Sequence, residues 1–378
     1  MDKIKIIVIS TSGFGERNGI AAVLYEYFKR FDKSIFEIHL VINCDSNEEV
    51  VNRFSSIGVK PIVLSDRNRD VLRYMSDLYK QIKQNKYNAI YVHGSSSLMI
   101  IELLVACLGN CKVRVVHSHN TTCNYKNMHI ILKPLFKFLY TDAIGCGEEA
   151  GQWLFGNKPF KVIKNARSIP EYKFDSGKRK QIRDDFKIDD RTLVIGHVGN
   201  FTKQKNQEFA VKVFSEILKR RNDCKMFFMG SGSQMLFVKN KAKELGVFDN
   251  IIFTGSIPNV SEMLQAMDVM ILPSLHEGLP LVVIEWQIAA LPSIISDTVT
   301  KECRYSNLVS FLPLDNAEAW AEKVLEVSVG DRVLIAEEQI ELTKAAGYDI
   351  DRNAIKLQEF FVDKCRMRED THLRGAKH

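Results

Sequence analysis

The stretch Ser274-Leu-His-Glu-Gly-Leu-Pro-Leu-Val-Val-Ile-Glu-Trp-Gln287 joins two different patterns. The apolar run that precedes it, residues 268–272, is typical of a buried β-strand, and the residues from Leu281 onward are typical of a helix. Glycine and proline between them predict a loop. Two carboxylates stand eight positions apart, Glu277 in the loop and Glu285 in the helix. Strand, loop and helix in this order favour a parallel α/β sheet, in which ligands bind beyond the carboxyl ends of the strands.

The start of this predicted helix is an expected anion site. The first amides of a helix have no partner within it, and the helix dipole adds positive potential there, so a phosphate group is stabilised. One acid then suits sugar hydroxyls and the other suits ribose hydroxyls. The alternative is a buried strand and an amphipathic helix that carry two incidental acids. The amides that we expect to contact the phosphate are those of Gly278, Leu279, Leu281 and Val282.

The rest of the chain repeats the alternation of strands and helices, which predicts doubly wound parallel sheets. A polar stretch, Ser168–Arg191, interrupts the pattern, and we place a domain linker at its beginning, near residue 166. A chain of 378 residues is long enough for two domains. The predicted strands are Lys3–Ser10, Phe36–Val41, Lys60–Leu64, Ala89–Val92, Val113–His117 and Ala143–Cys146 before the linker, and Leu193–Val198, Lys225–Met229, Ile251–Thr254, Asp268–Leu272 and Ser293–Ile295 after it.

We therefore predict domains at residues 1–165 and 166–349, followed by a helix at about 350–365. The segment from 366 to 378 has almost no apolar content and is expected to be disordered.

Composition and charge narrow the class of protein. No apolar run is long enough to span a bilayer, and the first residues resemble a strand, not a signal peptide. The eight cysteines contain no Cys-x-x-Cys pair, so we expect free thiols and a cytosolic location. Residues 1–160 hold 20 Lys and Arg against 15 Asp and Glu, whereas the remainder holds 32 against 31. A basic first half suits an anionic surface or acceptor, although a solubilising excess explains it equally well.

The spacing of Glu277 and Glu285 resembles the Glu-x7-Glu signature of the retaining glycosyltransferases of family four. The resemblance implies a GT-B fold, in which two Rossmann-like domains face each other across a cleft and the last helix crosses back to the first domain. It makes the first domain acceptor-binding and the second donor-binding. It also implies that Glu277 is catalytic and orients the donor sugar, while Glu285 holds the ribose.

Further motifs extend the resemblance into the first domain. The loop after the first strand contains Gly15 and Gly19, which we expect near the acceptor and the donor diphosphate respectively. At the end of the fifth strand, His117 matches a family histidine near the donor sugar and is predicted to be catalytic. His119 is an acceptor-side candidate. A buried structural role is the alternative for both histidines.

In the second domain, Lys205 matches the family lysine that neutralises the diphosphate, and we predict a catalytic role for it. Asn200 stands where arginine is usual, which weakens this clamp because an amide carries no charge. Lys203 is a candidate to compensate. Two later strands end in glycine-containing loops that are expected to embrace the nucleoside, with Gly230 in the first and with Ser256 and Ile257 in the second.

Two departures follow the second acid: Trp286 replaces a small residue, and Ala290 stands where glycine is common. We expect altered packing there without loss of activity. The apolar, lysine-containing segment Tyr125–Tyr140 predicts either a helix that faces the core with solvated lysines or one that lies on an anionic membrane.

These patterns together predict a retaining glycosyltransferase that moves a sugar from a nucleotide donor, most simply a UDP-sugar, to a lipid-linked glycan of a capsular or extracellular polysaccharide. No Asp-x-Asp motif lies within the segments that carry this resemblance, so we expect no metal and no other cofactor. We expect a location on the inner face of the cell membrane and no nucleic-acid partner. Two alternatives remain open: a UDP-sugar 2-epimerase of the same fold, and a catalytically silent subunit that binds a nucleotide or glycan.

Overall fold

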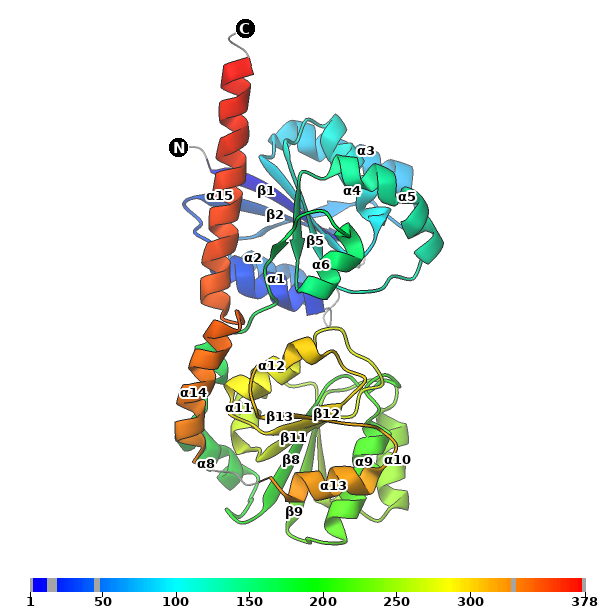
Figure 1. The fold of residues 1–378 in the computed structure, drawn as a ribbon, viewed down its shortest axis with the longest axis vertical. Helices are drawn as coiled ribbons and strands as arrows, with labels where there is room; N and C mark the ends of the chain where they lie inside the picture. The colour runs from blue at the N-terminus through cyan, green and yellow to red at the C-terminus, as the bar shows by residue number, and fades with distance from the viewer. Residues whose placement is uncertain (1–2, 12–18, 44–47, 328–330, 376–378) are drawn as a thin grey trace. The chain divides into compact units, whose positions relative to one another are not determined.

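The computed structural model describes residues 3–11, 19–43, 48–327 and 331–375, with side chains up to Arg368. The chain forms two compact units: unit 1 comprises residues 1–165 and 350–378, and unit 2 comprises residues 166–349. Each unit is a parallel sheet with helices on both faces (Figure 1). The expectation of two doubly wound Rossmann-like domains is confirmed. Gly15 lies outside the described residues.

Unit 1 is built on a seven-stranded sheet in the order β3-β2-β1-β4-β5-β6-β7. The order reverses between β1 and β4, which makes the carboxyl ends of these strands and their neighbours the expected ligand position. The strands are β1 (Ile4–Ser10), β2 (Phe36–Asn43), β3 (Lys60–Leu64), β4 (Ala89–Gly94), β5 (Val113–Ser118), β6 (Asp142–Gly145) and β7 (Lys161–Val162). The helices are α1 (Gly19–Lys29), α2 (Glu48–Ser56), α3 (Val71–Asn85), α4 (Ile100–Leu108), α5 (Lys126–Leu139), α6 (Glu148–Phe155) and α15 (Ile350–Gly375).

Unit 2 repeats this plan with six strands in the order β10-β9-β8-β11-β12-β13, and here the order reverses between β8 and β11. Apolar side chains from both faces of this sheet form two cores, one beneath α11, α12 and α14 and the other beneath α9, α10 and α13. The strands are β8 (Leu193–Val198), β9 (Cys224–Met229), β10 (Ile251–Gly255), β11 (Val269–Leu272), β12 (Ser293–Ser296) and β13 (Val309–Leu312). The helices are α7 (Ile169–Tyr172), α8 (Ser176–Asp185), α9 (Gln207–Leu218), α10 (Met235–Glu244), α11 (Val260–Ala266), α12 (Leu281–Ile288), α13 (Ala317–Leu325) and α14 (Arg332–Ala345).

The polar stretch after residue 167 is packed structure in unit 2. Arg183 of α8 is 2% exposed, and Asp268 at the start of β11 is 5% exposed. The Asp268 carboxylate accepts hydrogen bonds from Arg179 and from the backbone amide of Val194. Buried charges are tolerated when they are paired and hydrogen-bonded, so this charged segment can complete the unit.

Helix α15 belongs to unit 1 and packs on α1 and β5. Its described side chains bind the body of the unit: Lys364 Nζ lies 2.7 Å from Asp142 Oδ1, and Arg368 Nη1 donates to the Lys112 carbonyl over 2.6 Å. The prediction of a disordered segment from residue 366 is wrong for residues 366–375, which continue the helix. These polar anchors, which composition does not reveal, explain the difference.

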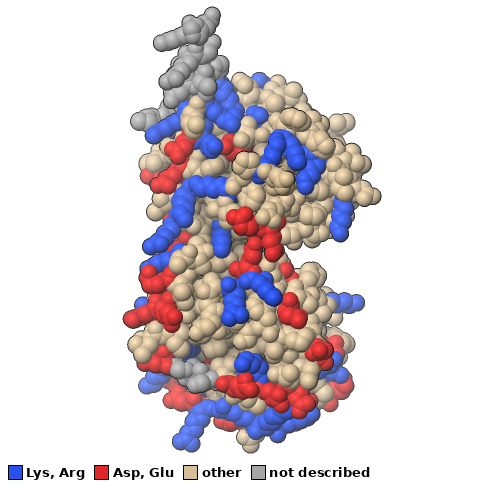
Figure 2. Space-filling view, in the orientation of Figure 1, with Lys and Arg blue, Asp and Glu red and all other residues tan. Residues whose placement is uncertain are grey.

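Helix α5 exposes most of its apolar side chains, and of its residues only His129 and Phe136 are buried. The core-facing interpretation therefore holds for the face that carries Phe136 and Leu139, whereas the opposite face is exposed. In Figure 2 the part of unit 1 around α5 is mainly uncharged surface with lysine and arginine atoms beside it. The exposed apolar side chains are Met128, Ile130, Ile131, Leu135 and Phe138, which are 47% to 80% exposed.

Candidate functional site

The first group of predicted residues meets at the carboxyl ends of β8 and β11 in unit 2, where the strand order reverses. Lys205 lies in the loop after β8, and Glu277 lies in the loop after β11. Lys205 Nζ is 2.6 Å from Glu277 Oε1, and the two side chains are 18% and 12% exposed. The structure thus brings together, from two strands, a cation and a carboxylate that are 72 positions apart in the sequence.

Backbone contacts hold these two loops against each other. The amide of Leu275 donates to the Gln204 carbonyl over 2.8 Å, and Gln204 Nε2 donates to the His276 carbonyl over 2.9 Å. Glu277 also forms a parallel bridge with Val299. Because the backbone is fixed on both sides, the ion pair has little freedom to separate without a competing ligand. Gln204 was not among the predicted site residues, and no sequence motif marks its role.

His197 lies behind Lys205 in β8 and is fully buried. Burial lowers the pKa of His197 to about 3, with a further contribution from the charge of Lys205. The imidazole is therefore neutral at physiological pH and leaves the positive charge of Lys205 as the local cation.

Helix α12 begins at Leu281, four residues after Glu277. The predicted phosphate amides therefore lie in the loop and in the first turn: Gly278 and Leu279 precede the helix, and Leu281 and Val282 open it. A helix start of this kind favours anions. The helix then places Glu285 beyond its first turn.

Glu285 is 6% exposed, and its carboxylate accepts a hydrogen bond of 2.6 Å from Arg167 Nε. No motif in the sequence marks Arg167, which lies 118 positions away. The one available signal was an isolated arginine at the start of the second predicted domain. In the described structure Glu285 therefore has a cationic partner, and a ribose would have to share this carboxylate with Arg167.

The two glycine-containing loops after β9 and β10 lie together. Gly230 donates its amide to the Gly255 carbonyl over 2.8 Å, and Ser231 and Ser256 hydroxyls are 2.8 Å apart. Gly230 has φ +146°, and a Cβ there would come within 2.1 Å of the Gly199 carbonyl oxygen. Only glycine allows the β9 loop to approach the β8 loop this closely. Ile257 packs against the core beneath α11 and α12, so its side chain is a support for the loop.

Asn200 and Lys203 do not form a described diphosphate clamp. The Asn200 carbonyl accepts a hydrogen bond from Gln207, which orients the loop, while Lys203 is exposed to solvent. The charge that an arginine would supply at residue 200 is thus not replaced by a side chain packed into the loop.

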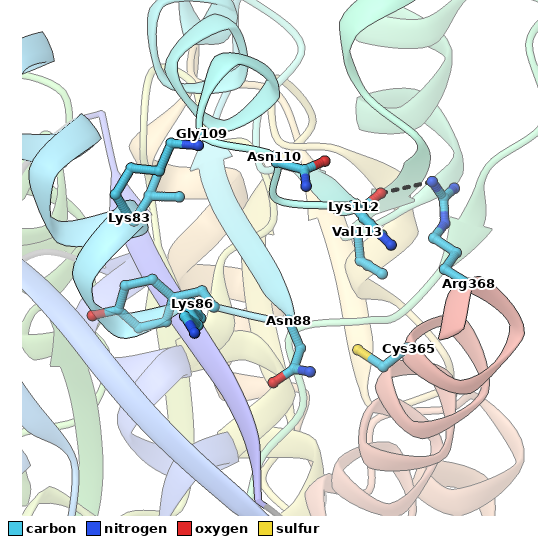
Figure 3. A pocket seen from close by; sticks show the side chains of 11 residues that line it. Lys83, Lys86, Asn88, Gly109, Asn110, Lys112, Val113, Cys365 and Arg368 are labelled. Atoms are coloured by element: carbon cyan, nitrogen blue, oxygen red, sulfur yellow. Dashed lines mark hydrogen bonds between the residues drawn. The ribbon is translucent and has the colours of Figure 1, made fainter. Parts of the chain in front are cut away.

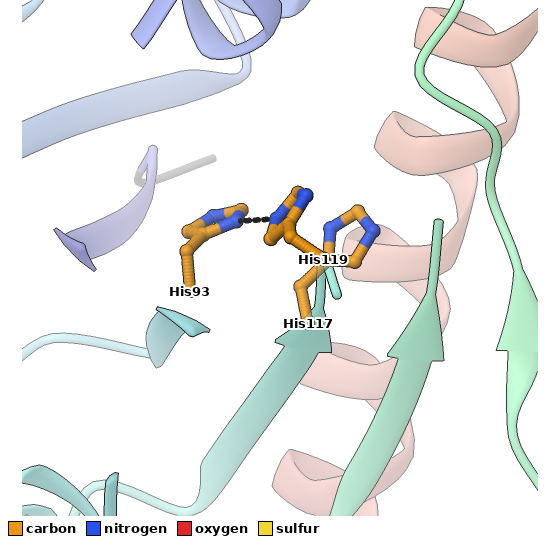
Figure 4. Close-up of side chains that lie close together, drawn as sticks. All are labelled: His93, His117 and His119. Carbon is orange, nitrogen blue, oxygen red and sulfur yellow. Dashed lines mark hydrogen bonds between the residues drawn. The ribbon is translucent and has the colours of Figure 1, made fainter. Parts of the chain in front are cut away.

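A second group lies in unit 1, at the carboxyl ends of β4 and β5. His93 and His117 are register partners on these parallel strands, and His119 follows two residues later on the same side (Figure 4). His93 Nδ1 and His119 Nε2 are 2.8 Å apart, and the Tyr91 hydroxyl is 2.6 Å from His117 Nδ1. His93 was missed, although its place at the end of a predicted strand matched that of His117. Gly19 begins α1, outside this group.

A separate cavity of about 410 Å³ lies at the opposite, amino ends of β4 and β5 (Figure 3). Lys83, Lys86, Lys112 and Arg368 are among its lining residues. Arg368 is already bound to the Lys112 carbonyl there. None of the predicted site residues lines this cavity, and we assign it no part in the site.

Comparison with known proteins shows which family unit 2 resembles. The family described as glycosyl transferases group 1 matches residues 178–331, which contain the Lys205–Glu277 pair and α12. The chain contains a group 1 glycosyltransferase domain. The chain is 26% identical over 356 residues to the protein named "Putative glycosyltransferase EpsF" of Bacillus subtilis (strain 168), with 89% of this chain and 91% of EpsF covered.

Two further proteins are similar to this chain, one in sequence and one in fold. The chain is 22% identical to an Escherichia coli protein named UDP-Gal:alpha-D-GlcNAc-diphosphoundecaprenol alpha-1,3-galactosyltransferase, over 92% of this chain and 94% of that protein. The crystal structure of Anabaena HepE in complex with UDP has a TM-score of 0.79 and 13% identity, and covers 95% of this chain and 100% of that one. The GT-B assignment of the fold is thereby confirmed.

Proposed function

We propose that this glycosyltransferase transfers a sugar from a UDP-sugar to a lipid-linked glycan, with retention and without a metal ion, during synthesis of a capsular or extracellular polysaccharide. The observation that carries the proposal is the Lys205–Glu277 pair beside the start of α12, at the strand reversal of unit 2. The relatives support the classes of donor and acceptor, since one is named for UDP-galactose and a diphosphoundecaprenol acceptor and HepE binds UDP.

Each of these residues of unit 2 has a separate proposed role. Lys205 and the amides at the start of α12 stabilise the negative charge that grows on the leaving diphosphate, a preorganised electrostatic role. Glu277 orients the donor sugar and stabilises positive character at its ring. Glu285 holds the ribose, and the loops at Gly230 and Ser256 enclose the nucleoside. A positive charge supplied by lysine and amides is our reason for proposing metal independence.

The test is transfer from UDP-glucose, UDP-galactose and UDP-N-acetylglucosamine to a polyprenyl diphosphate sugar, in buffer with EDTA. Wild-type protein should transfer one of these sugars, and Glu277→Gln should lose transfer while it still binds UDP in calorimetry. Transfer that requires an added divalent ion would contradict metal independence. UDP binding with no transfer from any of these donors would contradict the proposed donor class, and no binding would contradict the nucleotide site itself.

We also propose that α5 rests on the cytosolic face of an anionic membrane, where a lipid-linked acceptor would be found. The described residues include no helix long and apolar enough to cross a membrane. The supporting feature is the apolar face of α5, with Ile130, Ile131 and Phe138 exposed beside Lys126 and Lys137. Apolar side chains with flanking lysines suit the boundary between acyl chains and acidic head groups. Cysteines without a Cys-x-x-Cys pair favour the reducing side.

Sedimentation with vesicles tests this surface. The wild type should bind vesicles that contain phosphatidylglycerol, and serine at Ile130, Ile131 and Phe138 together should weaken binding at least about tenfold, because each buried apolar side chain contributes about 1.5–3 kcal/mol. Leu334→Ser is the matched control, since Leu334 is 66% exposed on α14 of unit 2. Equal loss in the control, or no effect of the triple change, would contradict the assignment of α5.

A further inference from the structure

The three histidines at the ends of β4 and β5 share one side of the sheet because of strand geometry. Side chains two positions apart along a strand point to the same face. His117 follows this rule with His119, and His93 is the register partner of His117 on the neighbouring strand. One ring nitrogen from each of the three lies within 4.8 Å of the others.

Three ring nitrogens of this cluster make no hydrogen bond within the described part of the chain. Among the described residues, Nε2 of His93, Nε2 of His117 and Nδ1 of His119 are buried and have no hydrogen-bond partner. A buried polar atom without a partner carries a desolvation cost of about 1–3 kcal/mol, and three in one place call for an explanation. An ion bound by Nδ1 of His93, Nε2 of His119 and Nε2 of His117 would give His117 Nε2 a partner.

We propose that His93, His117 and His119 form a binding site for one divalent transition-metal ion of the Zn²⁺ class. Neutral imidazole is a common ligand of such ions, and three protein ligands leave a fourth position for water or another ligand. His119 is partly exposed, whereas His93 and His117 are buried, so an ion would enter from the side of His119.

The ligand nitrogens lie within 4.8 Å of one another, so binding requires adjustments of up to about 1.4 Å to reach the separation that zinc needs. Tetrahedral zinc with bonds of 2.0–2.1 Å separates two nitrogen ligands by about 3.4 Å. His93 Nδ1 and His119 Nε2, at 2.8 Å, would move apart by about 0.6 Å. The proton that they share would move to the other nitrogen of the same ring, which has no partner at present, so no proton need be released. Burial lowers the pKa of His119 to about 3 and those of His93 and His117 well below the ordinary value, which keeps the rings unprotonated.

The surroundings also suit a metal site. Ligating histidines are generally oriented by a hydrogen bond to the second ring nitrogen. With Nε2 free to bind an ion, His117 Nδ1–H donates such a bond to the Tyr91 oxygen over 2.6 Å, and the Tyr91 ring packs edge-on against Phe361 of α15 at 5.1 Å. His117 is thereby held with Nε2 available to an ion.

A consequence rests on the proposed function: an ion that holds His117 withdraws this residue from transfer. We therefore expect Zn²⁺ to inhibit the glycosyltransferase and EDTA to restore it. Metal independence of the transfer in unit 2 and an inhibitory ion in unit 1 are compatible.

The test measures binding directly, so that it does not depend on activity. Protein treated with EDTA and desalted is titrated with Co²⁺, and we expect one equivalent with the visible absorption of four-coordinate cobalt, displaced by Zn²⁺. His93→Asn and His119→Asn should each lower affinity by more than about tenfold, and Tyr91→Phe, which keeps all three ligands, by about tenfold. His276→Asn, in unit 2, should have no effect.

Circular dichroism reports whether each variant is folded, and Tyr91→Phe keeps the test decisive if a histidine variant is not. No Co²⁺ binding by the wild type would overturn the proposal. So would a cobalt spectrum that survives both histidine changes, or one with sulfur charge-transfer bands that disappear after cysteine alkylation. Binding without inhibition would leave the site standing and contradict the role of His117 in transfer.

Discussion

Nε of Arg167 donates a hydrogen bond to Oε1 of Glu285 over 2.6 Å, and the two side chains are 10% and 8% exposed. The backbone of Arg167 also pairs with the residues at which unit 2 ends: its amide donates to the Tyr348 carbonyl, and it bridges to Asp349. One residue thus joins the predicted ribose acid of α12 to both ends of unit 2. The ion pair stabilises the fold, binds the ribose or does both, and measurements of stability and of UDP binding separate these roles.

Replacing one partner of the Arg167–Glu285 pair should destabilise unit 2 far more than replacing both. Glu285→Leu removes the carboxylate that accepts the hydrogen bond of the buried Arg167 guanidinium, which is expected to cost about 3–5 kcal/mol, whereas adding Arg167→Met should restore most of this stability. Thermal denaturation measures the recovery. Calorimetry with UDP then isolates the ribose role, since the double variant should be stable and still bind UDP weakly. Full recovery of UDP binding would show that Glu285 is structural only.

Lys205→Ala should weaken UDP binding about 10- to 100-fold, because a hydrogen bond to a charged group contributes about 1.5–3 kcal/mol. The loss should shrink as salt concentration rises, since salt screens the wild-type interaction. Titration calorimetry at two ionic strengths checks both statements. Lys219→Ala is the charge-matched control, because Lys219 lies on the surface of the same unit and pairs with Glu216. A similar loss in both variants would mean that net charge alone attracts the nucleotide.

Ala290→Gly should stabilise unit 2. Ala290 has φ +54°, follows the end of α12 and donates its amide to the Gln287 carbonyl, while Leu291 donates to the Trp286 carbonyl. This is a helix end that favours glycine, and a left-handed residue with a Cβ costs about 1–2 kcal/mol. We expect the melting temperature to rise by about 2–4 °C. Ala289→Gly, at φ −74°, should instead lower it, and a rise in both would refute the backbone explanation.

The buried imidazole of His197 should make the stability of unit 2 depend on pH. The folded pKa of about 3 lies below the ordinary value of about 6.5, so between these values the unfolded chain binds a proton that the folded chain does not. Stability from this residue is therefore complete above pH 6.5 and is lost as pH falls towards 3, by up to about 1.4 kcal/mol per pH unit.

Chemical denaturation between pH 7 and pH 4.5 measures this slope. His197→Met should flatten it, and His276→Met, at an exposed position, should leave it as in the wild type. An unchanged slope in His197→Met would show that other groups carry the acid sensitivity of unit 2.

The architecture was predictable because apolar, β-rich runs alternate with helical patterns through both halves of the chain. The strands that escaped prediction, β7 at Lys161–Val162 and β13 at Val309–Leu312, are short, and a run of two to four residues has no measurable period. Helix α8 was hidden for another reason: Arg183 is buried because backbone carbonyls at Asp189 and Thr192 accept its hydrogen bonds, and composition alone records only a charge.

The residues of the candidate site also form two groups: those that a local motif reveals and those whose role depends on a distant partner. Lys205 and Glu277 were found from local motifs, and the structure adds that they are in contact. Arg167 and His93 were missed because their importance lies in partners 118 and 26 positions away. A parallel sheet brings such residues together at the ends of its strands, but one sequence does not state which pairs will meet. The exposed face of α5 was one of two predicted alternatives, since an apolar period predicts a covered helix face as readily as a membrane-facing one.

The membership of α15 in unit 1 has a consequence for synthesis on the ribosome. Residues 166–349 are contiguous, so unit 2 can fold as soon as this segment has left the exit tunnel. Unit 1 is completed only by residues made after the whole of unit 2, when Lys364 and Arg368 reach Asp142 and Lys112. Until then the nascent chain keeps the surface meant for α15, including the edge of Tyr91, open to water and to chaperones. Unit 1, whose first segment is translated first, is thus among the last parts of the chain to complete its folding.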